Sequence, residues 1–172
     1  MKTVIVYESF YGNTAQVAEA IAEGMNGLGD IVFGRIDDLR PDAVAGADLV
    51  VAGGPTHAHG MATQATRRNG AGGTHAQPYH PTRDVLRDWM IDMPDVNADA
   101  ATFDTRFHKP RWMTGSAAKG IAKRLTAKGC KVVATESFFV SGSEGPLEAG
   151  ERERAVAFGR SLAERYGSRS AA

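Results

Sequence analysis

The chain has 172 residues, of which 42% are apolar, and its twenty basic side chains balance its twenty acidic ones. A chain of this length suits a single domain with a core of its own, which excludes a disordered protein and a small disulfide scaffold. The formal net charge of zero removes the usual electrostatic argument for binding nucleic acid or an anionic membrane. Cys130 is the only cysteine, so no internal disulfide forms. Without a signal peptide or an apolar run of about 18 residues, we expect a soluble cytoplasmic protein.

Strand and helix patterns alternate along the chain. Residues 4–7 and 49–52 are apolar runs without polar alternation, which predicts strands covered on both faces. Between them, apolar residues recur at helical spacing over 17–25, and 31–33 predicts a second strand. Further elements are predicted at residues 41–44 (a helical turn), 98–103 (a fourth strand), 117–128 (a helix capped by Ser116), 131–140 (a fifth strand) and 147–166 (an amphipathic helix). This alternation predicts an α/β fold with a doubly wound, five-stranded parallel sheet and helices on both faces.

Two segments stand outside this alternation. Residues 62–81 are rich in glycine, proline, arginine and histidine, and a polar loop of that length is uncommon unless it has a function. Residues 167–172 are small and polar, which predicts a disordered tail. We therefore expect one domain over residues 1–166. Within it, Trp89 and Cys130 are expected to be core residues.

The loop after the first strand carries the clearest chemistry. Ser9, Tyr11 and Thr14 supply hydroxyls, Asn13 supplies an amide, and Gly12 permits a tight turn before the helix. Because a helix start also offers backbone N–H groups without intrahelical partners, the loop can hold an anion. It has no lysine and lacks the glycine spacings of nucleotide triphosphatases and dinucleotide binders, so a terminal phosphate monoester fits better than a pyrophosphate. The alternative is a helix cap without a ligand.

In an open parallel sheet, ligands bind beyond the carboxyl ends of the strands. At that place, the run from Ser9 to Thr14 resembles the phosphate loop of flavodoxins, small electron carriers that bind FMN. The likeness extends over nearly the whole chain and implies the flavodoxin strand order 2-1-3-4-5. It implies FMN-binding residues in three loops: Ser9, Phe10, Tyr11, Gly12, Asn13 and Thr14; Pro55, Thr56, His57, Ala58, His59 and Gly60; and Phe103, Asp104, Thr105 and Arg106.

The resemblance gives each loop a role. The first loop would hold the phosphate, while the second and third would flank the two sides of the isoalloxazine ring. A peptide near His59 and Gly60 would lie beside flavin N5, where glycine can flip its peptide at little steric cost. The protein would orient the flavin and tune its potential, since the redox chemistry belongs to the cofactor.

The chain also departs from flavodoxins. Those proteins usually cover the ring with Trp or Tyr from the second loop, which here has neither, so Trp112 is our candidate cover, with an exposed surface tryptophan as the alternative. Flavodoxins are typically strongly acidic, whereas this chain is neutral, and its expected flavin edge carries basic residues: Arg67, Arg68, Arg106, Lys109 and Arg111. They predict docking to an acidic partner or an anionic substrate, with an ordinary solvated surface as the alternative.

Four histidines fall in one stretch of the chain: His57, His59, His75 and His80. No matching acids or cysteines accompany them, so we expect polar packing and no metal site.

Two functions remain open. The first is an FMN-binding electron carrier that shuttles electrons between redox partner proteins. The alternative is an FMN-dependent NAD(P)H:quinone oxidoreductase that reduces a small acceptor. The missing aromatic cover and the neutral charge argue against a conventional flavodoxin, while the small size and the lack of an obvious nicotinamide site argue against a self-sufficient reductase. We favour the carrier and assign no catalytic residue.

Overall fold

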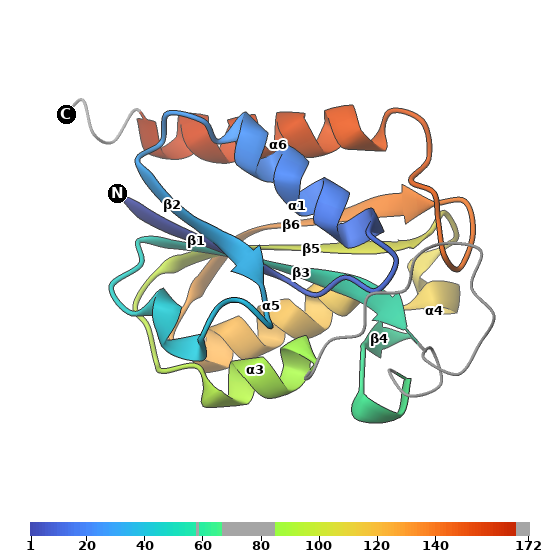
Figure 1. Cartoon of the computed structure of the whole chain (residues 1–172), viewed down its shortest axis with the longest axis horizontal. Coiled ribbons are helices and arrows are strands. Elements are labelled where there is room, and N and C mark those ends of the chain that lie inside the picture. The colour runs from blue at the N-terminus through green and yellow to red at the C-terminus, as the bar shows by residue number, and fades with distance from the viewer. Residues whose placement is uncertain (58, 67–84, 168–172) are drawn as a thin grey trace.

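A parallel sheet runs through the middle of the molecule (Figure 1). The structure, a computed structural model, describes residues 1–57, 59–66 and 85–167. The parallel strands lie in the order β2-β1-β3-β5-β6, which confirms the predicted arrangement, and the additional short strand β4 pairs antiparallel with β3. The strand bounds are Lys2–Tyr7 (β1), Asp30–Arg35 (β2), Leu49–His57 (β3), Gly60–Met61 (β4), Asp99–Phe107 (β5) and Lys131–Val140 (β6).

Helices cover both faces of the sheet, as predicted. Figure 1 shows α1 (Asn13–Gly24) and α6 (Glu151–Gly167) on one face, with α3 (Leu86–Asp92) and α5 (Ala117–Ala127) on the other. The single turns η1 (Pro41–Val44) and α4 (Arg111–Thr114) are also helical. Alternate residues of β1 pack into separate apolar clusters on the two faces, which explains why these strands are apolar without alternation. None of the helices in the described residues is both long and apolar enough to span a bilayer.

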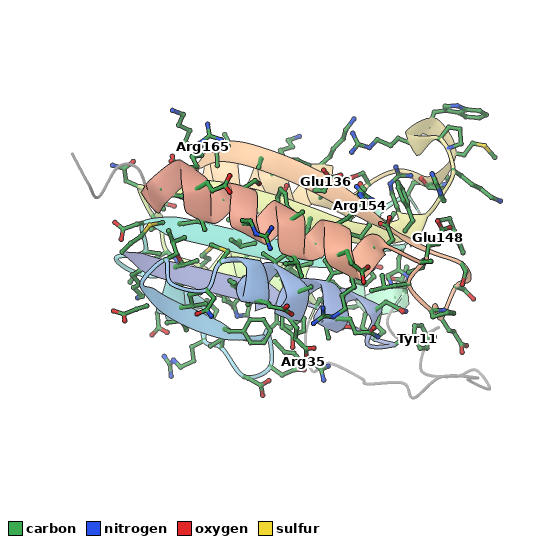
Figure 2. The ribbon with its side chains drawn as sticks, turned by 90° about the horizontal axis from the view of Figure 1, so that it is seen from above. Tyr11, Arg35, Glu136, Glu148, Arg154 and Arg165 are labelled. Carbon is green, nitrogen blue, oxygen red and sulfur yellow. The ribbon has the colours of Figure 1, made fainter. Side chains whose placement is uncertain are left out.

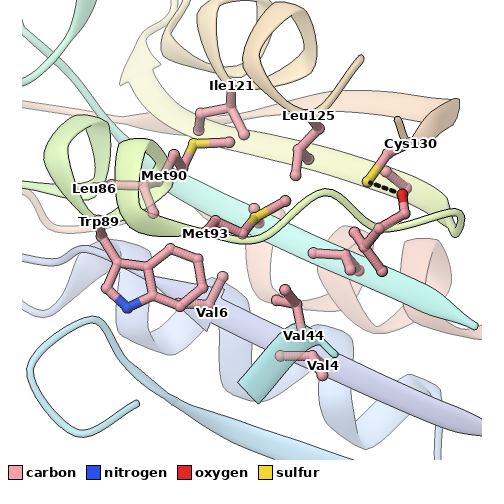
Figure 3. Packing of buried hydrophobic residues seen from close by; sticks show 14 of the residues in the cluster. Val4, Val6, Val44, Leu86, Trp89, Met90, Met93, Ile121, Leu125 and Cys130 are labelled. Carbon is pink, nitrogen blue, oxygen red and sulfur yellow. Dashed lines mark hydrogen bonds between the residues drawn. The ribbon is translucent and has the colours of Figure 1, made fainter. Parts of the chain in front are cut away.

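Figure 3 shows the cluster of buried apolar residues between the sheet and the helices α3 and α5. Trp89 is 5% exposed and its indole N–H donates to the carbonyl of Leu39 at 2.7 Å. Cys130 is buried beside Val96, and burial raises the pKa of its thiol. Both residues are therefore core residues, as predicted, and the thiol lacks the exposure and thiolate character of a reactive cysteine.

Three element boundaries differ from the prediction. β3 runs on to His57, because it pairs in parallel with β5 as far as Pro55 and its last two residues pair antiparallel with β4. β5 runs on to Phe107, because its parallel pairing with β6 continues to that residue. Sheet hydrogen bonding between distant residues thus extends strands through polar sequence that reads locally as loop. α6 begins at Glu151 and not at residue 147, because residues 147 and 148 pair back onto the end of β6.

Parts of the predicted long loop and tail lie outside the described residues, namely 67–81 and 168–172. The described part of the tail is Gly167, which ends α6. The extent of the domain, residues 1–166, therefore stays a prediction.

Gly53 on β3 provides a test of the packing. The Phe103 ring covers Gly53 from the neighbouring strand, and a Cβ added to the glycine would lie 2.2 Å from a ring carbon. The ring is fully buried against Phe138 and cannot move away. We expect Gly53→Ala to lower the free energy of unfolding by about 1–3 kcal/mol, measured by urea denaturation.

Gly54 is the matched control, because it lies next along the same strand. A Cβ there would come no closer than 3.6 Å to Leu86, which is ordinary contact. We expect Gly54→Ala to be neutral or slightly stabilising, since alanine reduces the entropy of the unfolded chain. Equal destabilisation by both substitutions would contradict the packing described.

Candidate functional site

The carboxyl ends of β1, β3, β5 and β6 meet at one edge of the sheet and enclose a cavity of about 320 Å³. In Figure 2, Tyr11 and Glu148 lie at this end of the molecule, and Arg165 lies at the opposite end. The cavity is lined by residues from all four strand ends and one further segment: Ser9, Phe10, Tyr11, Asn13, Thr14, Pro55, Thr56, His57, Thr66, Thr105, Arg106, Phe107, Val140, Gly142 and Ser143.

The loop between β1 and α1 forms one wall of this cavity. Gly12 caps the helix in a left-handed conformation, with φ of 83°, which a side chain would strain. Ser9 Oγ accepts a hydrogen bond from the Ala15 N–H at 3.2 Å, and the Thr14 and Thr105 hydroxyls bond to each other at 2.8 Å. The loop therefore brings hydroxyls and the first turn of α1 to the same wall.

The loop between β6 and α6 braces this wall, and sequence reasoning missed it. The Asn13 amide lines the cavity but donates to the carbonyl of Glu144 at 2.9 Å, so it ties the two loops together. Val140, Gly142 and Ser143 also line the cavity. A signal was available, because β6 is parallel to β5 and its following loop must emerge at the same edge of the sheet.

The Arg35 side chain contacts the β1–α1 loop, which has no cationic residue of its own. The guanidinium of Arg35 donates to the carbonyl of Ser9 at 3.4 Å and lies 3.6 Å from Asp37. Arg35 ends β2 and pairs in register with Tyr7 at the end of β1. Parallel pairing therefore brings it to the loop, which no local pattern could indicate.

Of the second predicted loop, Pro55, Thr56 and His57 line the cavity. The His57 ring packs against Phe10 at 5.2 Å between ring centroids, and its Nε2 atom is buried without a hydrogen-bond partner. Burial lowers the pKa of His57 below its ordinary value, which favours the neutral imidazole.

The rest of that loop lies elsewhere. His59 adopts a left-handed conformation, with φ of 72°, in the tight turn where Gly60 pairs with His57. Neither residue lines the first cavity, although His59 lines a second one. Ala58 lies outside the described residues.

The third predicted loop is the end of β5, and its residues divide between the cavity and the interior. Thr105 and Arg106 line the cavity, whereas the Phe103 ring belongs to the core under α1 and α6. Asp104 is fully buried, and its Oδ2 accepts from Thr56 Oγ1 at 3.1 Å, Ser116 Oγ at 2.6 Å and the Ala118 N–H at 2.9 Å.

Phe103 and Asp104 therefore lie in the interior, and the FMN contacts expected for them stay predictions. Phe103 packs inside the molecule because of its apolar ring, and Asp104 ties β3 and β5 to the start of α5 through its carboxylate. Neither residue lies on the cavity wall.

The Trp112 side chain is 83% exposed and does not line the cavity, which agrees with the alternative of an exposed surface tryptophan. The aromatic residue of this segment that does line it is Phe107, which sequence reasoning missed. Phe107 ends β5 and is 40% exposed, so one part of its ring remains in solvent.

Arg106 is the only cavity-lining residue of the described chain with a full charge. It is 8% exposed, and its Nη1 donates to the carbonyl of Phe107 at 3.3 Å, the carbonyl of Lys109 at 2.7 Å and Thr114 Oγ1 at 3.0 Å. Burial lowers the pKa of Arg106 and the nearby Asp104 charge raises it, yet a guanidinium remains protonated at neutral pH. Among the described residues, the cavity lining thus combines hydroxyls, aromatic rings and one cation, with no carboxylate, which suits an anionic ligand with a flat apolar part.

A second cavity of about 270 Å³ adjoins the first and shares Thr56, Arg106 and Phe107 with it. Its other lining residues are His59, Lys109, Met113 and Thr114. Across the described ranges, no group of three His, Cys, Asp or Glu side chains could hold a metal ion. His75 and His80, like Arg67 and Arg68, lie outside those ranges.

Comparison with known proteins shows that this fold is similar to that of flavodoxins. Residues 4–67 match a family model described as a flavodoxin domain, and no curated protein matches the chain. A solved flavodoxin from the domain Archaea has 18% identity and a TM-score of 0.65, over 97% of this chain and 99% of its own. Flavodoxin 1 from Bacillus cereus has 19% identity and a TM-score of 0.67, over 95% and 98%. A flavodoxin, WrbA-like protein from Agrobacterium tumefaciens has 19% identity and a TM-score of 0.60, over 97% and 98%. At these identities, the likeness shows a common fold.

The buried His57 imidazole predicts an acid sensitivity of the fold. Its folded-state pKa is lowered, so the unfolded chain binds more protons once the pH falls below about 6.5, the ordinary value. Stability should therefore decrease as the pH falls below that value. We expect His57→Leu to lose less stability than the native chain between pH 7.5 and pH 5.5, measured as the urea midpoint. His108→Gln is the control, because that side chain is exposed. If both variants lost equally less stability than the native chain, the acid sensitivity would not come from His57.

Proposed function

From its fold and the cavity at its strand ends, we propose that the chain is a flavodoxin-like protein that binds FMN and passes electrons between redox partner proteins. The observation that carries this proposal is the composition of the cavity wall. Hydroxyls, a helix start and aromatic rings line it, and no carboxylate lines it within the described residues.

The β1–α1 loop fits the phosphate of FMN. Ser9, Thr14 and Thr105 bring hydroxyls to the wall, and the first turn of α1 adds backbone N–H groups that lack intrahelical partners. Hydrogen bonds to an ionised phosphate are stronger than those between neutral groups. The loop would therefore hold the phosphate end of the ligand without a lysine.

The aromatic walls fit the ring of the ligand. Phe10, Tyr11 and Phe107 line the cavity, and Phe107 replaces Trp112 as the candidate for packing on the isoalloxazine. A volume of about 320 Å³ is at the lower end of the roughly 300–1,000 Å³ of small-molecule sites, so the ligand would keep one edge accessible. When bound, FMN would supply the redox chemistry, and an accessible edge is what electron exchange with another protein requires.

One observation favours the alternative function, an FMN-dependent NAD(P)H:quinone oxidoreductase. The second cavity shares a wall with the first, so a small acceptor could reach the ligand through it. The cationic Arg106 and Lys109 at this cavity would suit an anionic acceptor.

The two functions are separated by stepwise anaerobic reduction of the FMN-loaded protein, followed by absorbance. For a carrier, we expect the long-wavelength absorbance of a one-electron-reduced flavin at half reduction. Direct bleaching by NADH or NADPH, with quinone turnover and no such absorbance, would establish the oxidoreductase instead. A failure to bind FMN in equilibrium dialysis would reject both functions.

Thr14 tests the position of the phosphate. We expect Thr14→Val to weaken FMN binding about tenfold in equilibrium dialysis, because it removes one hydroxyl that would bond to the charged phosphate. Thr102→Val is the matched control: it also removes one hydroxyl from a threonine pair, with Thr135 at 2.9 Å, but away from the cavity. A similar loss of affinity in both variants would show that the Thr14 hydroxyl has no particular role.

A further inference from the structure

The segment that follows β5, residues 107–114, presents apolar side chains to solvent. Trp112 is 83% exposed, Met113 44% and Phe107 40%. In the described part of the chain, six large apolar side chains are exposed, and these are three of them. Exposed apolar side chains that cluster in this way mark a surface for binding another molecule.

The same segment carries positive charge. It contains His108, Lys109 and Arg111 and no acidic residue. His108 pairs with Glu148 at 3.0 Å, whereas no carboxylate of the described residues lies within 4.0 Å of the Lys109 or Arg111 side chains. The segment itself thus presents two cations, Lys109 and Arg111, although the total charge of the chain is zero.

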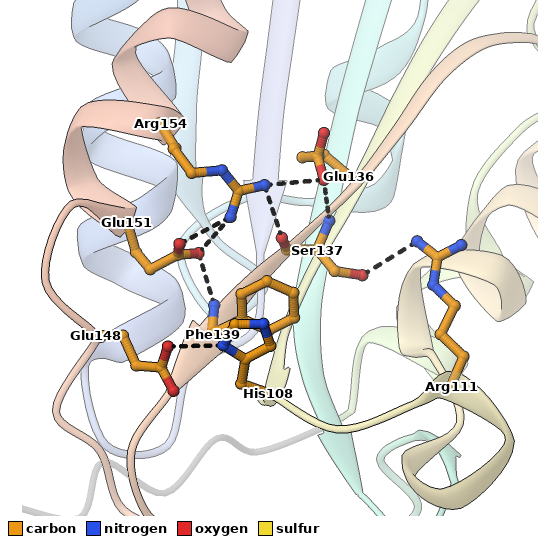
Figure 4. A network of polar contacts seen from close by, with 8 residues as sticks. All are labelled: His108, Arg111, Glu136, Ser137, Phe139, Glu148, Glu151 and Arg154. Carbon is orange, nitrogen blue, oxygen red and sulfur yellow. Dashed lines mark hydrogen bonds and ion pairs between the residues drawn. The ribbon is translucent and has the colours of Figure 1, made fainter.

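Contacts with β5, β6 and the loop before α6 hold the segment in place (Figure 4). The His108 ring stacks on Phe139 at 4.1 Å between centroids, and the Arg111 guanidinium donates to Ser137 Oγ at 3.4 Å. Beneath them, Arg106 donates to the carbonyl of Lys109. The backbone is therefore fixed while the Trp112 side chain remains exposed, and a preorganised surface loses less entropy on binding.

The segment also adjoins the cavities. Phe107 lines both, and Lys109 and Met113 line the second. A molecule seated on the segment would cover the opening of the second cavity and lie beside a ligand in the first.

We propose that residues 107–114 form the docking surface for an acidic protein, with Trp112 as the apolar anchor and Lys109 and Arg111 as the charged rim. Tryptophan and arginine are the residues that most often dominate protein interfaces, and complementary charge speeds the encounter. The chain's zero net charge weighs against nucleic acid as the occupant. That the partner is a redox protein rests on the proposed function, whereas the docking surface does not.

The test uses an acidic plant-type ferredoxin as the probe and basic cytochrome c as the probe of opposite charge. Binding to the full chain is measured by isothermal titration calorimetry at low and at physiological salt. We expect the ferredoxin to bind and to lose affinity as salt rises. Trp112→Ala should weaken that binding about tenfold. The double substitution Lys109→Glu and Arg111→Glu should weaken it further and reduce its salt dependence.

Matched controls separate the segment from the rest of the surface. Ile91→Ala removes an apolar side chain that is 60% exposed on α3, and Lys123→Glu reverses an exposed charge on α5. Both should leave ferredoxin binding unchanged. Equal losses in the control variants, tighter binding of cytochrome c, no ferredoxin binding, or binding to anionic lipid vesicles in its place would each overturn the proposal.

FMN titrations of the same variants keep the two proposals distinct. Trp112→Ala should retain the native affinity for FMN, because Trp112 does not line the cavity. Ferredoxin binding that depends on Trp112 in a chain with no affinity for FMN would reject the proposed function and leave the docking surface standing. FMN binding without ferredoxin binding would reject the docking surface and leave the proposed function standing.

Discussion

One buried carboxylate connects the elements that form the site. Asp104 on β5 accepts hydrogen bonds from Thr56 on β3 and from Ser116 and the Ala118 N–H at the start of α5. All three bonds go to Oδ2, whereas Oδ1 is buried without a hydrogen-bond partner. A buried carboxylate is costly unless it is hydrogen-bonded, and the start of a helix is a favourable place for it. Because Thr56 lies on the cavity wall, its bond to Asp104 links the β3 side of that wall to β5. The residue expected to touch the ligand instead positions the residues that line the cavity.

Charge is distributed unevenly around this site. Carboxylates are absent from the described wall of the first cavity, and burial keeps the His57 imidazole neutral, so hydroxyls and backbone N–H groups dominate there. Cationic side chains lie near this cavity. Arg35 contacts the β1–α1 loop, and Lys109 and Arg111 belong to the segment after β5. An anion in the cavity would therefore be bound by short hydrogen bonds, while the surface outside would select partners by longer-range attraction. These are separate effects, and only the second is strongly screened by salt.

The electron carrier and the oxidoreductase differ in what would occupy the second cavity. A small acceptor there would share the wall formed by Thr56, Arg106 and Phe107 with the ligand of the first cavity. A protein docked on residues 107–114 would cover the same place. Arg106 takes part in both arrangements, because it lines both cavities and its Nη1 also holds the backbone of the segment at Lys109. Ligand binding and docking would thus both involve one buried guanidinium.

The sequence by itself determined the order of strands and helices, the core positions of Trp89 and Cys130, and the place of the glycine turn between β1 and α1. These features are local, since apolar periodicity, a turn glycine and a helix start are all legible within a few neighbouring residues. Only the tertiary structure decided that β5 continues to Phe107, that Arg35 reaches the loop, and that the β6–α6 loop closes the cavity. It also decided that Phe107 lines the cavity while Trp112, five residues later, faces solvent. Each of these outcomes depends on pairing or packing between residues far apart in the chain, which no local pattern records.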